Sequence, residues 1–129
     1  VYKFKGADKT ALCTDAMRGA GMPDGESMLG SLTNGQKVII EDGVAKLPNR
    51  SAFAGSVATT DRLVKTMINI AGIPLIDAIR MITLTPARIL HVDSQKGSLE
   101  EGKDADIVIF DNQINITTTI SEGHVIYNQ

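Results

Sequence analysis

The 129-residue sequence has one cysteine, Cys13, and no apolar run near the roughly 20 residues needed to cross a bilayer. A single cysteine cannot form a disulfide within the chain, and it suits a reducing compartment. Acidic and basic residues nearly balance, 15 against 13, so the charge favours neither nucleic acid nor an anionic membrane as a partner. We therefore expect a cytoplasmic chain that binds no nucleic acid and no membrane.

Histidine is also scarce. His91 and His124 are the only two, and they form neither an H-x-H nor an H-E-x-x-H spacing. Each is more simply a solvent-facing or half-buried side chain than a metal ligand. No Ser-His-Asp arrangement and no phosphate-binding loop is recognisable. The sequence therefore predicts no metal site within these residues.

The composition that is present is that of a folded domain, with 43% hydrophobic and 22% charged residues. The first residues, Val1 to Gly6, include no initiating methionine, and no apolar signal segment follows them. We therefore expect the chain to be part of a longer protein.

The first half of the sequence indicates a strand, a loop and a hairpin. Residues 10–14 are mostly apolar and precede a charged residue, which is typical of a buried strand. Residues 19–35 have the glycine-rich composition of a loop. Residues 38–41 and 44–47 flank Asp42-Gly43, a pair favoured in type I′ turns, and so predict a β-hairpin.

After the hairpin, apolar residues recur at the spacing of helices. Ser56 is expected to cap a helix that ends at Gly72, and a second helix is predicted from Pro74 through Thr83. Thr85 is expected to cap a short third helix. The residues expected to face the core are Val57, Thr60, Leu63, Val64, Met67, Ile68 and Ala71 in the first helix, and Leu75, Ala78, Ile79, Met81 and Ile82 in the second.

The last quarter changes to the spacing of strands. Residues 105–111, 116–120 and 124–127 are rich in β-branched residues, and Glu122-Gly123 supplies a turn before the last run. These features predict a three-stranded antiparallel piece at the end of the chain.

Asp15 is the first candidate for chemistry, because a carboxylate between an apolar strand and a glycine-rich loop has the placement of catalytic residues in barrel enzymes. Spacing alone favours a simpler role, in which Asp15 braces the next turn. Ala54-Gly55-Ser56 is a second candidate, since free backbone N–H groups at a helix start can hold an anion or a polar ligand. An ordinary serine cap explains that segment equally well.

Four short motifs occur in an order that is known from one group of hydrolases. They are Leu12-Cys13-Thr14-Asp15-Ala16-Met17 with the glycine-rich loop behind it, Phe53-Ala54-Gly55-Ser56 with Thr60-Asp61, Thr85-Pro86-Ala87-Arg88, and Gly97-Ser98-Leu99 continuing to Val108. The first two resemble the last barrel strand and the substrate-contacting turn of the N-acetylglucosamine-6-phosphate deacetylase family. The last two resemble motifs of the wider amidohydrolase superfamily. The likeness covers nearly the whole chain.

The resemblance implies an α/β fold. Residues 1–92 would form the C-terminal part of a (β/α)8 barrel, including its last strand, and residues 93–129 would form strands of a small composite β-sandwich. Because a barrel cannot close with one of its strands, this piece would expose surfaces that favour a homo-oligomer.

The resemblance also implies an activity, the removal of acetate from N-acetylglucosamine 6-phosphate, a phosphorylated amino sugar. Asp15 would be the catalytic acid/base, and Phe53, Ala54 and Gly55 would contact the substrate. The full-length enzyme would use a divalent metal, zinc or similar, whose ligands lie upstream of these residues. We therefore expect no metal bound to this chain and no activity from it alone.

Two departures and two alternatives remain. Thr85 stands where the superfamily usually has asparagine, and Ser27-Met28 where an aromatic residue is common. The chain could instead derive from a dihydroorotase-like, hydantoinase-like or aminoacylase-like amidohydrolase. It could also be a stand-alone interaction module without catalysis.

Overall fold

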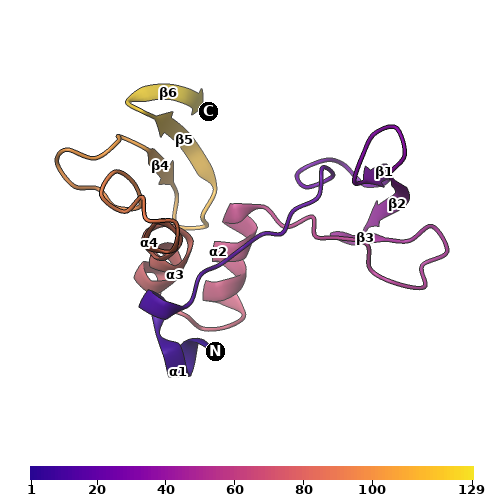
Figure 1. Cartoon of the computed structure of the whole chain (residues 1–129), viewed down its shortest axis with the longest axis horizontal. Helices are drawn as coiled ribbons and strands as arrows, with labels where there is room; N and C mark the ends of the chain where they lie inside the picture. Colours follow the sequence, from indigo (N-terminus) through magenta and orange to yellow (C-terminus); the bar gives the residue numbers. More distant parts are fainter. The chain divides into compact units, whose positions relative to one another are not determined.

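The computed structural model describes residues 1–129, and their packing divides them into two compact units (Figure 1). Unit 1 consists of Val1–Leu12 together with Val64–Gln129, and unit 2 consists of Cys13–Leu63. Each unit contains one three-stranded antiparallel sheet, so the predicted mixed α/β class is confirmed. The boundary expected after residue 92 concerns domains of a longer protein and stays a prediction.

The sheet of unit 2 consists of β1 (Gly25–Leu29), β2 (Gln36–Glu41) and β3 (Val44–Lys46), in that order. The predicted hairpin is confirmed, since Asp42 and Gly43 adopt φ angles of 55° and 70° and join β2 to β3 as in a type I′ turn. Both angles are positive, which is why asparagine, aspartate and glycine dominate such turns.

Two expectations for the first half of the chain are wrong. Strand β1 lies inside residues 19–35, which the composition predicts to be a loop, because β2 offers it a full register of backbone partners. The strand predicted over residues 10–14 does not form, and Cys13 is exposed rather than packed. Strands are stabilised by hydrogen bonds to neighbouring strands, and no strand of this chain pairs with residues 10–14.

The helices are short. Helix α2 (Thr60–Asn69) begins in unit 2 and continues into unit 1, which also contains α1 (Tyr2–Lys5), α3 (Leu75–Ile82) and α4 (Leu84–Ile89). A 3-10 turn, Ala7–Lys9, follows α1. The second and third predicted helices are confirmed, and so is the turn at Gly72, where φ is 66°.

Two predicted helix caps are wrong because both side chains bind other backbone groups. The hydroxyl of Ser56 accepts the N–H of Ala58 at 3.1 Å, and α2 begins only at Thr60. Thr85 lies inside α4 with 1% of its surface exposed, and its hydroxyl donates to the carbonyl of Ala7 at 2.7 Å.

The core of unit 1 lies between its helices and the N-terminal segment. The predicted core positions Val64, Ala78 and Met81 are confirmed, whereas Leu75 is 43% exposed and Ala71 is also exposed. The buried cluster consists of Ala7, Val64, Ile73, Ala78, Met81 and Ile114.

The C-terminal sheet is confirmed as an antiparallel meander of β4 (Ile107–Phe110), β5 (Ile116–Ser121) and β6 (His124–Asn128). Figure 1 shows these strands in succession at the yellow end of the chain. Every residue of β6 is exposed, including Val125, Ile126 and Tyr127. None of the helices combines the length and the apolar character that spanning a membrane requires.

Candidate functional site

The residues predicted to carry the chemistry all lie in unit 2, on two segments that pair with each other. Ala16, directly after Asp15, forms an isolated parallel bridge with Ser56, directly after Gly55. The amide of Met17 donates to the carbonyl of Ser56 at 2.8 Å. The two motifs that resemble the deacetylase family are therefore adjacent in space as well as ordered in the sequence.

Asp15 is exposed, and its backbone has a φ of 46°. This left-handed conformation is uncommon outside glycine, although aspartate adopts it more readily than most residues. The carboxylate takes part in none of the hydrogen bonds or ion pairs within the chain, so it does not brace the following turn. The geometry leaves the carboxylate accessible to a ligand.

The segment Phe53-Ala54-Gly55 is fixed through its backbone. Phe53 forms an antiparallel bridge with Lys46, and the N–H of Ala54 donates to the carbonyl of Ala45 at 2.8 Å. Ala54 is buried, whereas the Phe53 side chain is 77% exposed. Since α2 begins only at Thr60, the expectation that this segment lies at a helix start is wrong, and the Ala54 amide is already bonded.

Gly55 packs tightly against the segment that contains Asp15. Its φ of 99° is one that side chains rarely adopt, and a Cβ there would lie 3.2 Å from Met17 Cγ and 3.3 Å from Leu29 Cδ1. Met17 in turn packs against the buried cluster of Ile40, Ala45 and Val57. A residue two positions after Asp15 therefore joins the site to the core of unit 2.

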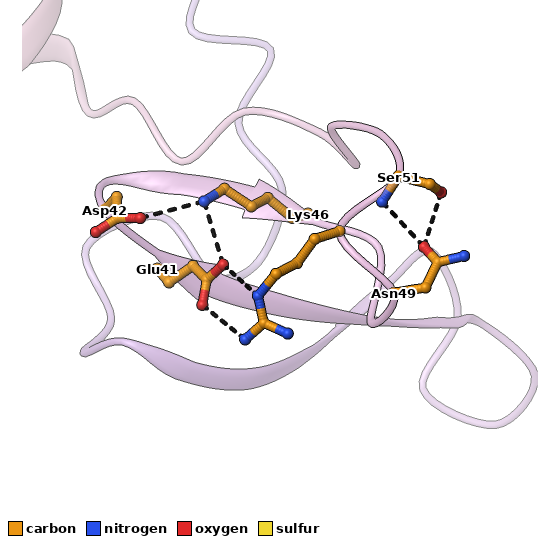
Figure 2. A network of polar contacts seen from close by, with 6 residues as sticks. Glu41, Asp42, Lys46, Asn49 and Ser51 are labelled. Atoms are coloured by element: carbon orange, nitrogen blue, oxygen red, sulfur yellow. Dashed lines mark hydrogen bonds and ion pairs between the residues drawn. The ribbon is translucent and has the colours of Figure 1, made fainter.

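A network of charged side chains joins the end of β2, the hairpin turn, the end of β3 and the loop before Phe53. Figure 2 shows Glu41 and Asp42 facing Lys46, whose Nζ lies 3.1 Å from Glu41 Oε1 and 3.2 Å from Asp42 Oδ2. Glu41 also binds Arg50. Sequence reasoning missed this network, because nothing in the spacing shows that residues 41 and 50 meet across the intervening turn.

Metal ligands are not gathered within these residues. No group of three or more His, Cys, Asp or Glu side chains lies close enough together to hold a metal ion. His91 and His124 are exposed, and both belong to unit 1. The residues of this chain therefore do not fit a metal centre by themselves.

Unit 1 contains a hollow of about 680 Å³ between α3, α4, the segment from Val92 to Asp106 and the C-terminal sheet. Its lining is largely apolar, with Lys96, Asp104 and Asp106 among it. Lys96 Nζ forms ion pairs with Asp104 at 2.8 Å and with Asp106 at 2.6 Å, so these three charged side chains neutralise one another. None of the predicted site residues lines this hollow.

The sequence model of the amidohydrolase family matches residues 8–126. This chain belongs to the amidohydrolase family. It is 41% identical over 124 residues to the N-acetylglucosamine-6-phosphate deacetylase of Lysinibacillus sphaericus, covering 96% of this chain and 30% of that protein. It is 36% identical over 118 residues to a putative N-acetylgalactosamine-6-phosphate deacetylase of Escherichia coli K12, covering 92% of this chain and 68% of that protein.

Solved structures of deacetylases are also similar to this chain. The N-acetylglucosamine-6-phosphate deacetylase of Pasteurella multocida superposes with a TM-score of 0.87 at 32% identity, over 98% of this amidohydrolase chain and 32% of that one. A mutant deacetylase of Mycobacterium smegmatis in complex with N-acetyl-D-glucosamine-6-phosphate gives a TM-score of 0.85 at 28% identity, over 98% of this chain and 33% of that one.

The resemblance predicted from the four motifs is therefore confirmed. The chain spans about 30% of the length of the Lysinibacillus relative and about a third of each solved deacetylase. The activity of the whole protein is therefore proposed and not read from this chain alone.

Proposed function

We propose that the protein containing this chain hydrolyses the acetamide of N-acetylglucosamine 6-phosphate to glucosamine 6-phosphate and acetate. The observation that carries the proposal is the backbone contact between Met17 and Ser56, which brings the segment that follows the exposed Asp15 beside the segment that follows Gly55. The similarity to deacetylases over nearly the whole chain supports the same activity.

Asp15 is proposed as the acid/base. Water attacks the acetamide carbonyl carbon while the Asp15 carboxylate takes one proton from it. The C–N bond then breaks as Asp15 returns that proton to the nitrogen, because an amine leaves poorly unless it is protonated. The products are acetate and the free amino sugar, and the aspartate ends the cycle ionised.

Phe53, Ala54 and Gly55 are proposed to contact the sugar. The exposed Phe53 ring offers an apolar surface, and the backbone bridges to Lys46 and Ala16 hold the segment around Gly55 in place. A rigid turn beside the acid/base would hold the acetamide in one orientation, which is a large part of catalysis in such sites.

The remainder of the fold and the metal belong to the same proposal. Residues 1–92 would contribute the last strand, the hairpin and the C-terminal helices of a (β/α)8 barrel, and residues 93–129 would contribute strands of a composite β-sandwich. By the same resemblance, a divalent metal, zinc or similar, would be held by residues outside these 129. The chain alone would then be inactive.

We further propose a cytoplasmic homo-oligomer. The exposed apolar residues of the edge strand β6 support self-association, because an unpaired strand edge is a ready surface for pairing. Sedimentation of the protein over a range of concentrations should give a mass above that of one chain. A compact monomer at high concentration would contradict this part of the proposal.

A second substrate, N-acetylgalactosamine 6-phosphate, is favoured by one observation. The chain covers 68% of a 36% identical relative that is named for that activity. The two sugars differ at one hydroxyl, so the same acid/base and the same turn could serve either.

The test is a comparison of substrates with the protein that contains this chain. Hydrolysis should be measured as acetate release from both N-acetylated sugar phosphates, as ring opening of a cyclic amide, and as release of the free amino acid from an N-acyl amino acid. We expect the highest kcat/KM on N-acetylglucosamine 6-phosphate. Activity on only the last two compounds would move the protein to another branch of the amidohydrolase family and overturn the proposal.

A further inference from the structure

Glu41 is a carboxylate outside the proposed site that binds two cations at once. It is the last residue of β2, and its side chain is 26% exposed. Oε1 accepts from Arg50 Nε at 2.8 Å and from Lys46 Nζ at 3.1 Å, while Oε2 accepts from an Arg50 terminal nitrogen at 3.0 Å. The pairing with Arg50 is two-pronged, which fixes direction as well as distance.

The segment that Arg50 belongs to leads directly into Phe53-Ala54-Gly55. Leu47 N–H donates to the carbonyl of Ala52 at 2.9 Å, and Arg50 N–H donates to the carbonyl of Leu47 at 2.8 Å. Residues 47–52 therefore form a closed loop between β3 and Phe53. This loop leads into Phe53 and acts together with the backbone bonds of Phe53 and Ala54 to β3.

The backbone of the loop is strained at the residue that Glu41 binds. Arg50 has a φ of 59°, a left-handed conformation that arginine rarely adopts. Such a conformation persists only where its surroundings hold it. A second anchor is local: the side-chain oxygen of Asn49 accepts from both the amide and the hydroxyl of Ser51, at 3.1 and 2.7 Å (Figure 2).

We propose that Glu41 is a positioning residue which, by holding Arg50 in its left-handed conformation, sets the place of the Phe53–Gly55 turn against the substrate. This inference rests on the proposed function for its kinetic consequences. Glu41 itself touches no substrate and acts through Arg50. The hydrogen bonds from Arg50 and from Lys46 hold the pKa of Glu41 below its usual range, so the anchor is charged at neutral pH.

The first test is Glu41→Gln in the protein that contains this chain. Glutamine keeps the shape but loses the charge and presents a donor where Arg50 needs an acceptor. We expect KM for N-acetylglucosamine 6-phosphate to rise roughly tenfold, the scale of a hydrogen bond to a charged group, with kcat changed far less. The matched control is Asp42→Asn, which removes the other anion beside Lys46 but suits a type I′ turn and keeps both hydrogen bonds between Glu41 and Arg50; KM should stay within about twofold.

The second test separates positioning from general stability. Arg50→Gly adopts a positive φ without strain, whereas Arg50→Ala does not, so the glycine variant should keep the lower KM of the two. If Glu41 acts through Arg50, Glu41→Gln should add little in the Arg50→Gly background. Fully additive effects, or an unchanged KM in folded Glu41→Gln, would overturn the inference. If Glu41→Gln fails to fold by itself, the same comparison is made in the Arg50→Gly background, where the loss of Glu41 should leave KM unchanged.

The third test needs no activity. Amide exchange at Ala54, whose N–H is bonded to the Ala45 carbonyl, should be faster in Glu41→Gln than in the unaltered protein. Equal exchange rates would contradict the anchoring role. If the unaltered protein deacetylates neither sugar phosphate, the proposed function fails, and the exchange measurement still decides whether Glu41 holds the turn.

Discussion

Unit 1 buries six apolar residues in one cluster with seven partly buried ones packed against them, whereas the cluster of unit 2 has three, with Met17 beside them. Unit 2 instead relies on backbone bridges, close packing at Gly55 and the charged pairs of Glu41. The proposed site residues all lie in unit 2. The difference indicates that the geometry of the site depends on a few directional contacts, which single substitutions can remove, rather than on a large apolar core.

The largest effect on stability is expected in the core of unit 1. Met81 is 1% exposed, and Met81→Ala should destabilise the protein by about 2–5 kcal/mol, because it removes buried atoms and leaves a cavity. Met81→Leu, which keeps the volume, should cost less than about 1.5 kcal/mol. Thermal and urea unfolding of the protein that contains this chain would measure both.

If the site depends on directional contacts within unit 2, the lower stability of Met81→Ala should not change substrate binding. Below the unfolding transition, Met81→Ala should leave KM on the preferred sugar phosphate unchanged, since Met81 lies in unit 1. A large rise in KM in a variant that is still folded would show that the site depends on the apolar core after all.

A smaller effect on stability, but a direct one on the site, is expected from Gly55→Ala. The new Cβ would meet Met17 and Leu29 at a φ of 99°, so strain and crowding together should cost about 1–3 kcal/mol, and KM should rise. The matched control is Gly102→Ala in unit 1, where φ is 89° and nothing lies within 4 Å of the added carbon.

The two glycine variants share the unfavourable φ and differ in crowding and in unit. Melting temperature and KM should therefore be measured for both. Gly102→Ala should lower stability somewhat and leave KM alone. An equal rise in KM in the two variants would contradict the claim that close packing at Gly55 matters for the site.

The smallest effect is expected from acid. The pKa of Glu41 in the folded chain lies below its ordinary value of 4.5, chiefly because of the hydrogen bond from Arg50. A lowered pKa means that Glu41 contributes stability above pH 4.5 and loses it as the pH falls through the lowered value. At the basic end, the pKa of Lys46 is raised by its bond to Glu41, so the network persists through neutral pH.

Amide exchange at residues 47–55, corrected for the intrinsic effect of pH, should therefore accelerate only below about pH 4.5. The change should be modest, because partly exposed ion pairs are weak. The Glu41→Gln variant should lack this acid dependence. Acid acceleration that is identical in the variant would assign it to other carboxylates.

Local signals in the sequence predicted the elements whose stabilising partners lie nearby. Asp42-Gly43 supplies both positive φ angles of its turn, and the three C-terminal strands pair with their sequence neighbours. The strand expected over residues 10–14 failed for the opposite reason, since no strand of the chain pairs with it.

The caps at Ser56 and Thr85 failed because other backbone groups bind their hydroxyls, the nearby N–H of Ala58 for Ser56 and a distant carbonyl for Thr85. Thr85 binds the carbonyl of Ala7, which lies 78 residues away in the sequence. For the site, the motifs selected Asp15 and the Phe53–Gly55 turn, and the structure pairs the residues directly after each of them, Ala16 and Ser56. The Glu41–Arg50 pair could not be predicted, because it depends on the path of the loop between the two residues.

The most direct test is the rate of acetate release from N-acetylglucosamine 6-phosphate by the protein that contains this chain, with and without Asp15→Asn. Asp24→Asn, an exposed aspartate of the same unit, serves as the control. The account predicts that Asp15→Asn lowers kcat by roughly 10²–10⁴-fold, the usual contribution of a general acid/base, while folding and the control are unaffected. A folded Asp15→Asn variant with nearly full activity would contradict the assignment of Asp15.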